Sequence, residues 1–152
     1  MRGLIWLVAM LAFCILTGCD TGPAEPNPGE SEIDVIEPVS HPNAGAPVGV
    51  VYFRIRNNAL SPDRLIRVET PAASKAELHE TVANGDLMRM IHRPDGFEIS
   101  AGGELVFESG GKHVMLTGLV GQLKEGSSIK LDLVFARAGA VHVVVPIRPR
   151  AY

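Results

Sequence analysis

The sequence predicts an all-β domain, built as an antiparallel sandwich or a Greek-key barrel. From residue 32 onward, short apolar segments alternate with polar residues at the period of two that is typical of half-buried strands. The chain has 16 Gly and 11 Pro, many of which fall between these segments. No stretch of adequate length shows a helical period, and the 152 residues contain no internal repeat and no second domain.

The N-terminus has the pattern of a signal peptide that ends in a lipidation site. Arg2 gives a positive start, and the apolar run over 4–16 is too short for a membrane-spanning helix. The tetrapeptide LTGC at 16–19 resembles a bacterial lipobox, whose Cys is lipidated and becomes the mature N-terminus. We therefore expect a lipoprotein signal peptide over 1–18 and a lipid anchor at Cys19. The alternative is an ordinary signal peptide with a chance Cys.

A spacer and one domain follow this site. Residues 19–31 are rich in Pro, Gly and acidic side chains, which predicts a flexible linker before a domain over 32–152. The only other Cys, Cys14, lies in the signal peptide, so the mature domain has no free thiol and no disulfide. Asp20 resembles the inner-membrane retention signal of enteric lipoproteins. We therefore expect a periplasm-facing protein that is anchored at the inner membrane of a bacterial cell envelope.

Turn residues divide the domain into eight to ten short strands. The first begins at Ile33 and ends near Pro38, and the pair Asn84-Gly85 is a strong signal for a hairpin. The segment 48–57 shows the clearest alternation of apolar and polar residues. The remaining strands are expected over 64–70, 75–82, 87–91, 97–99, 104–108, 113–119, 129–135 and 141–147.

His and Met side chains gather in the segment 79–115, where they suggest a metal site. Imidazole and thioether are uncharged ligands of borderline and soft character, a set that suits Cu(I) better than Zn(II) or Mg(II). His113 and Met115 are two residues apart on one predicted strand, so they share a face. A hairpin about Asn84-Gly85 would bring the strand of His79 beside that of Met90, in a register that the sequence leaves open. The segment's His and Met residues are His79, Met88, Met90, His92, His113 and Met115.

Other function classes lack support in the sequence. No nucleophile motif, zinc-binding helix motif or phosphate-binding loop is present, so we do not expect an enzyme. The net charge is −3, without a run of like charges, which argues against nucleic acid as a partner. A blue-copper electron carrier would need a Cys ligand, which the mature domain lacks. The remaining His residues, His41 and His142, are interpreted as structural or surface residues.

One alternative function stays open at this point. The chain could be a metal-free β-sandwich lipoprotein module that binds a protein partner or a ligand. That alternative predicts no copper uptake, and a core in which Met90 and Met115 are fully buried away from His79 and His113.

Several stretches of the domain match the sequence of a known family. They are YFRIRN at 52–57, DRL at 63–65, AELHE at 76–80, MRM at 88–90, AGG at 101–103, GGKHVML at 110–116 and LKEG at 123–126. Ten residues separate His79 from Met90, and 22 separate Met90 from the His-x-Met pair that begins at His113. From about Glu32 to Ile147 the domain thus resembles the periplasmic copper chaperones of the PCu(A)C family, whose signature is a His, then a Met, and after a longer interval His-x-Met. The interval after Met90 is one residue longer than in that signature, and we place the extra residue in the turn 91–96.

The resemblance implies a cupredoxin-like antiparallel Greek-key β-sandwich that acts as an extracytoplasmic Cu(I) chaperone. Such a protein would deliver Cu(I) to a partner such as the copper centres of cytochrome c oxidase. Its partners would be copper-donating or copper-accepting periplasmic proteins, with the membrane contacted through the lipid anchor. The longer turn allows Met88 or His92 to take the place of Met90. The ligands that the resemblance implies are His79, Met90, His113 and Met115.

Overall fold

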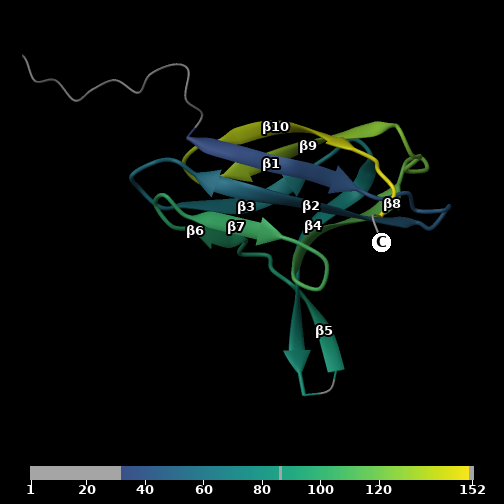
Figure 1. Cartoon of the computed structure of the whole chain (residues 1–152), viewed down its shortest axis with the longest axis horizontal. Coiled ribbons are helices and arrows are strands. Elements are labelled where there is room, and N and C mark those ends of the chain that lie inside the picture. The colour runs from purple at the N-terminus through teal and green to yellow at the C-terminus, as the bar shows by residue number, and fades with distance from the viewer. Residues whose placement is uncertain (1–31, 86, 151–152) are drawn as a thin grey trace, which may run out of the picture. The chain divides into compact units, whose positions relative to one another are not determined.

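The computed structural model describes residues 32–85 and 87–150, which form ten β-strands in two sheets (Figure 1). The predicted signal peptide over 1–18 and the whole predicted linker over 19–31, which includes Cys19, lie outside the described residues. Within those residues, no helix is long and apolar enough to cross a membrane. The strands are β1 (Ile33–Ser40), β2 (Val48–Asn57), β3 (Asp63–Glu69), β4 (Ala73–Asn84), β5 (Leu87–His92), β6 (Phe97–Ile99), β7 (Glu104–Phe107), β8 (Lys112–Leu119), β9 (Ser128–Phe135) and β10 (Ala140–Pro146).

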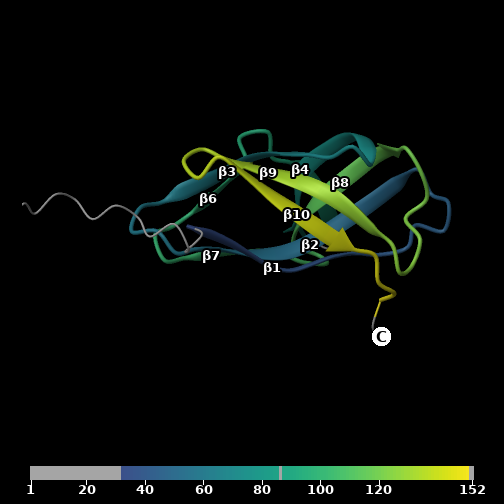
Figure 2. The same cartoon turned by 90° about the horizontal axis from the view of Figure 1, so that it is seen from above.

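Two sheets make the sandwich that the sequence predicted. One has the strand order β1-β2-β7-β8-β4-β5 and the other β10-β9-β3-β6, and Figure 2 shows the two layers from above. Nearly all neighbouring strands are antiparallel, but β7 meets β8 in a short parallel contact in which Phe107 pairs with Lys112. One edge of β2 pairs with β1, and the other edge is divided between two strands, because residues 53–56 pair with β7 and 48–51 with β8.

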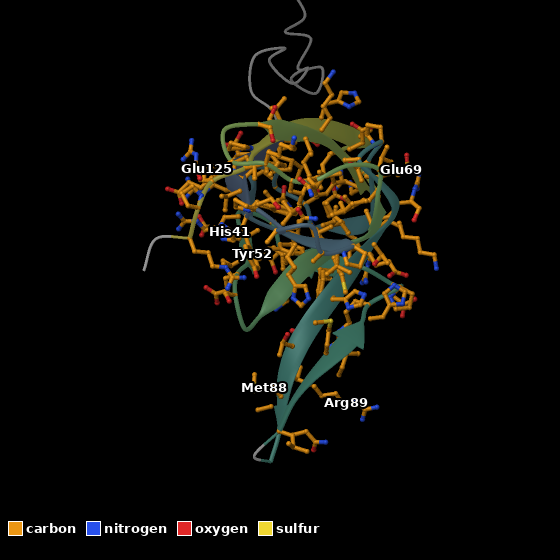
Figure 3. All side chains as sticks on the ribbon, turned by 90° about the vertical axis from the view of Figure 1, so that its right-hand side faces the viewer. His41, Tyr52, Glu69, Met88, Arg89 and Glu125 are labelled. Atoms are coloured by element: carbon orange, nitrogen blue, oxygen red, sulfur yellow. The ribbon has the colours of Figure 1, made fainter. Side chains whose placement is uncertain are left out.

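The hairpin of β4 and β5 extends beyond the sandwich (Figure 1). Residues 73–80 of β4 pair with β8, and 79–84 pair with β5, so the hairpin end of β4 has only one partner strand. Gly85 has a φ of +62°, a left-handed conformation that suits the tight turn predicted at Asn84-Gly85. Met88 and Arg89 lie on this projecting hairpin (Figure 3).

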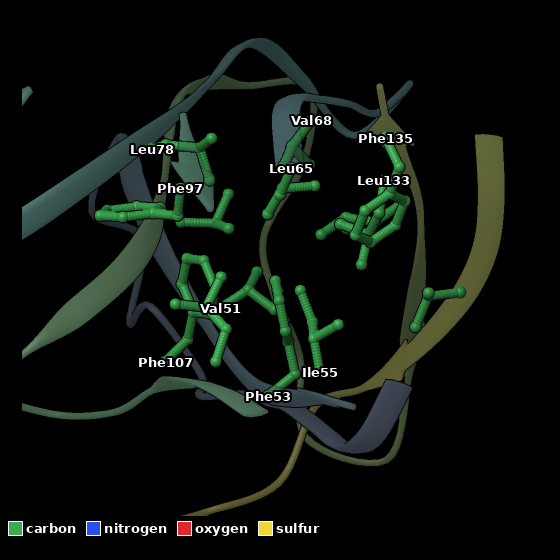
Figure 4. Close-up of a cluster of buried hydrophobic side chains, with 14 of the residues drawn as sticks. Val51, Phe53, Ile55, Leu65, Val68, Leu78, Phe97, Phe107, Leu133 and Phe135 are labelled. Carbon is green, nitrogen blue, oxygen red and sulfur yellow. The ribbon is translucent and has the colours of Figure 1, made fainter. Parts of the chain in front are cut away.

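Alternate residues of the strands fill the space between the sheets. Val51, Phe53 and Ile55 of β2 face Leu65 of β3 and Leu133 of β9 in the core (Figure 4), and each is at most 3% exposed. Burial of each such side chain stabilises the fold by about 1.5–3 kcal/mol. Because successive residues of a strand point to opposite faces, the residues between these core positions lie on the outer face.

The first strand differs from the prediction that it ends near Pro38. It continues to Ser40, and its register with β2 shifts between Ile36 and Val39. Glu37 has a φ of +51°, as expected for a residue that bulges out of the ladder. Strand β1 lies at the edge of its sheet, where a Pro without an N–H is tolerated. The bulge therefore allows the strand to pass through Pro38.

Candidate metal centre

Three His side chains from three neighbouring strands form a row on the outer face of the six-stranded sheet. His79 of β4 lies directly opposite His113 of β8 on one side and His92 of β5 on the other. The ring centres are 5.8 Å apart for His79 and His113, and 5.3 Å apart for His79 and His92. The neighbouring residues Leu78 and Val114 belong to the core, so the His row faces outward.

Two thioethers continue the row along β5. Met90 and Met88 alternate with His92 at the two-residue spacing that keeps side chains on one face. Met90 pairs with Thr81, so it is a diagonal neighbour of His79, while Met88 lies farther along the hairpin. Diagonal neighbours lie about 7–8 Å apart, a distance that long side chains can bridge. Met90 is 51% exposed and Met88 is 64% exposed, so both thioethers are accessible to solvent.

A third thioether lies on the other side of His79. Met115 follows His113 on the same face of β8 and pairs with Glu77 of β4, which makes it the second diagonal neighbour of His79. Its side chain is half-buried. Met90 and Met115 are therefore not fully buried, and they share a sheet face with the imidazoles. This arrangement is contrary to what the metal-free alternative predicts.

A hydrogen bond to the backbone selects the tautomer of His113. Its Nδ1 lies 3.1 Å from the carbonyl oxygen of Gly111. A carbonyl can only accept a hydrogen bond, so the proton is on Nδ1 and the lone pair is on Nε2. The ring is 5% exposed, which further restricts its orientation. His113 is thus held in the tautomer and the place that a metal-binding imidazole requires.

The imidazole of His79 is buried without a hydrogen-bond partner. Both of its ring nitrogens are buried and neither has a hydrogen-bond partner. The nearby Glu77 carboxylate oxygen is 3.8 Å from Nε2, beyond hydrogen-bond length. A buried polar group without a partner costs about 1–3 kcal/mol, and a bound metal ion would remove that cost. The position of Glu77 was not singled out from the sequence, although it lies two residues before His79 and hence on the same face.

The spacing of the rings fits shared ligation of one ion. A ligand nitrogen lies about 2.0–2.1 Å from a metal and roughly 1.1 Å from its ring centre, so two imidazoles on one ion have centres roughly 5–6 Å apart. Both ring pairs fall in or near this range. Within 32–85 and 87–150, no three His, Cys, Asp or Glu side chains are arranged to hold a metal. The donors that the strand pairing brings to this face are imidazoles and thioethers, which are ligands of the kind that suits Cu(I).

Glu80 secures the base of the hairpin on the side opposite to His79. Its carboxylate accepts hydrogen bonds from the Arg93 guanidinium, with Nε at 2.9 Å, and it lies 3.1 Å from Lys112 Nζ. Burial acts to raise the pKa of Glu80, but the hydrogen bonds from Arg93 and Lys112 outweigh it and hold that pKa below its ordinary value. These contacts join β4, β8 and the segment after β5. They therefore fix the register that aligns the three His residues.

We expect the His79 ring to titrate below the ordinary His pKa of about 6.5. Burial is the main cause of the lowered pKa, positive charge on His113 and His92 adds to it, and Glu77 opposes it. Between the folded and unfolded pKa values the unfolded chain binds more protons, so the free energy of unfolding should decrease as pH falls from about 6.5 through the folded pKa. Ring-proton NMR shifts across this range, and denaturant unfolding above and below it, measure both effects. A His79 midpoint at or above the ordinary value would contradict the prediction.

Comparisons with known proteins place the chain in a family. The family described as "Putative lipoprotein LpqE-like" matches residues 33–147. The protein named "Putative lipoprotein Lxx21020" from Leifsonia xyli subsp. xyli is 31% identical over 105 residues. That match covers 69% of this chain and 63% of the relative, so the chain spans less than two thirds of the relative's length.

Solved PCuAC domains share the fold. The copper-bound PCuAC domain from PmoF2 matches with a TM-score of 0.64 and 22% identity over 78% of this chain and 94% of that domain. The apo PCuAC domain from PmoF1 matches with a TM-score of 0.61 and 25% identity, over 78% of this chain and 95% of that domain. The structure of CuI-DR1885 from Deinococcus radiodurans matches with a TM-score of 0.60 and 23% identity, over 88% of this chain and 84% of that protein. The expectation that the chain is not an enzyme agrees with its membership of this family. The chain therefore belongs to the LpqE-like, PCuAC-like family and has the cupredoxin-like β-sandwich of PCuAC copper-binding domains.

Proposed function

We propose that the chain is an extracytoplasmic chaperone that binds Cu(I) and passes it to a partner protein. The observation that carries this proposal is the position of His79, whose two buried nitrogens have no partner and whose ring lies between two other imidazoles. Thioethers lie on the same face at both diagonal positions. The proposed ligands are His79, Met90, His113 and Met115.

The chemistry of these ligands suits a carrier. Thioethers neither titrate nor form disulfides, so they avoid the disulfide formation that puts a Cys site at risk in an oxidising compartment. Met90 is half exposed, so a ligand of a partner protein can reach the ion while His79 and His113 still hold it. Two imidazoles from neighbouring strands of one sheet provide a rigid base, and the exposed thioether leaves readily.

The test of this function is Cu(I) uptake followed by transfer. We expect the full chain, purified in detergent, to bind one Cu(I) in competition with a Cu(I) chelator, with X-ray absorption showing both nitrogen and sulfur ligands. The loaded chain should then metallate a copper-free copper domain of cytochrome c oxidase, the acceptor that we propose.

Two negative results would count against different parts of the proposal. Failure to compete for Cu(I) would reject the chaperone and favour the metal-free module. Uptake without transfer to the oxidase domain would reject only that acceptor.

We also propose that Cys19 anchors the chain by lipid at the periplasmic face of the inner membrane. The lipobox-like LTGC at 16–19 supports this anchor, as does the lipoprotein description of the family. Replacement Cys19→Ala removes the only thiol that could carry the lipid after signal cleavage. We expect the variant to move from the membrane fraction to the soluble fraction, measured by fractionation and immunoblot. A variant that stays with the membrane would contradict the lipobox.

A further inference from the structure

We propose that His92 is an exit ligand, through which Cu(I) leaves the site toward a partner. This inference rests on the proposed function, because it concerns how the same ion is released. In the resting position the ion is held by His79 and His113 together with the two proposed thioether ligands. In the exit position it is held between His79 and His92, at the exposed edge of the hairpin.

The His row offers two alternative positions for one ion. His79 lies between the other two rings, with ring centres 5.8 Å from His113 and 5.3 Å from His92. These two separations are similar, and each is compatible with two imidazoles on a single metal. An ion can therefore exchange one outer imidazole for the other without leaving His79. In this step a nitrogen of His92 forms a bond to copper as the bond to His113 breaks, and Cu(I) keeps its oxidation state.

Exposure rises in one direction along the row. His113 is 5% exposed and the His79 side chain is 13% exposed, whereas His92 lies on the exposed edge strand β5. Met90 and Met88 follow on the same strand and are more than half exposed. An incoming ligand from a partner thus reaches the ion most easily from the His92 side. The resting ligand His113 is too enclosed for that role.

A hollow beside His92 provides room for a ligand of the partner protein to reach the ion. It measures about 220 Å³ and is lined by residues 66–68 of β3, 76–78 of β4, and 92–94 at the end of β5 and just after it. The hollow lies beyond the end of β5. There, residues of β4 before His79 pair with β8 but not with β5. His92 lines the hollow and also contacts His79, so it connects the opening with the row. His92 lies outside the His, Met and His-x-Met signature of the PCu(A)C family.

The experiment separates release from affinity. The full chain in detergent is loaded with Cu(I), and transfer to excess bathocuproine disulfonate is followed by stopped-flow absorbance for the wild type and for His92→Asn. We expect the transfer rate of the variant to fall about tenfold, while its equilibrium affinity changes less than about threefold. His142→Asn, which alters an exposed His on the other sheet, is the matched control and should match the wild type in both measurements.

A structural readout accompanies the kinetics. In His113→Ala loaded with Cu(I), the ion has only the exit position, so the ring nitrogen resonances of His92 should shift by NMR relative to the copper-free variant. An unchanged transfer rate in His92→Asn, or a loss of affinity as large as that of His113→Ala, would overturn the exit role. Absence of Cu(I) binding by the wild type would instead reject the proposed function itself.

Discussion

Replacement of His79 by Ala should lower the affinity for Cu(I) by about 100-fold or more, because even loss of a group that only supports a metal ligand costs about 10- to 100-fold. His79 is the one imidazole that adjoins both of the others, and both thioether positions are diagonal to it. Its loss removes the shared ligand and leaves His113 and His92 two strands apart. Competition with a Cu(I) chelator measures the effect in the full chain.

The fold should survive this change. The ring of His79 buries two nitrogens that have no hydrogen-bond partner, so Ala at this position removes an unfavourable burial together with some packing. We expect the free energy of unfolding of the copper-free variant to lie within about 1 kcal/mol of that of the wild type. His142→Ala is the control, because that ring is 80% exposed and pairs only with Asp132 among the described contacts. Equal affinity in His79→Ala and the control would exclude His79 as a ligand.

Replacement of Asp63 by Ala should lower the free energy of unfolding by about 3–5 kcal/mol, since hydrogen bonds to a charged group contribute about 1.5–3 kcal/mol each and do not add fully. The Asp63 carboxylate is 7% exposed and accepts three backbone N–H groups. Oδ1 accepts from Arg64 at 2.7 Å and from Arg137 at 2.9 Å, and Oδ2 accepts from Ala138 at 3.0 Å. The carboxylate thus ties the start of β3 to the turn between β9 and β10.

Two further variants test this explanation by denaturant unfolding. Asp63→Asn keeps the size and one acceptor oxygen, so it should lose less stability than Asp63→Ala. Asp95→Ala changes an exposed Asp whose backbone carbonyl, rather than its side chain, accepts a hydrogen bond from Arg64, so it should stay within about 0.5 kcal/mol of the wild type. Equal stabilities for Asp63→Ala and Asp95→Ala would show that the three backbone hydrogen bonds contribute little.

The ten strands were predictable because their signals are local. Alternation in β2 and the turn at Asn84-Gly85 each lie within a few residues, and both are found where expected. The pairing of β7 with β8 and the bulge at Glu37 were not predictable. They depend on how strands from distant parts of the chain fit together in one sheet.

The sequence alone determined which His and Met donors each strand offers and the face of the strand on which they lie. The spacing of His113 and Met115, and of Met90 and His92, places each pair on one side of its strand by the period of two. Which strands become neighbours, and in which register, was decided only by the tertiary structure. A shift of one residue would have turned a whole set of side chains to the other face.

The registers of β5 and of β8 against β4 decide which side chains become neighbours of His79, and local sequence patterns do not predict this. It places His92, rather than Met90, directly opposite His79, and Met90 and Met115 at the diagonals. It also buries the nitrogens of His79 beside Glu77, with no hydrogen-bond partner. Sequence periodicity determines the donors that each strand offers. Long-range strand pairing determines which of them meet, because β4 and β8 are far apart in the chain and their alignment depends on the packing of the whole sandwich.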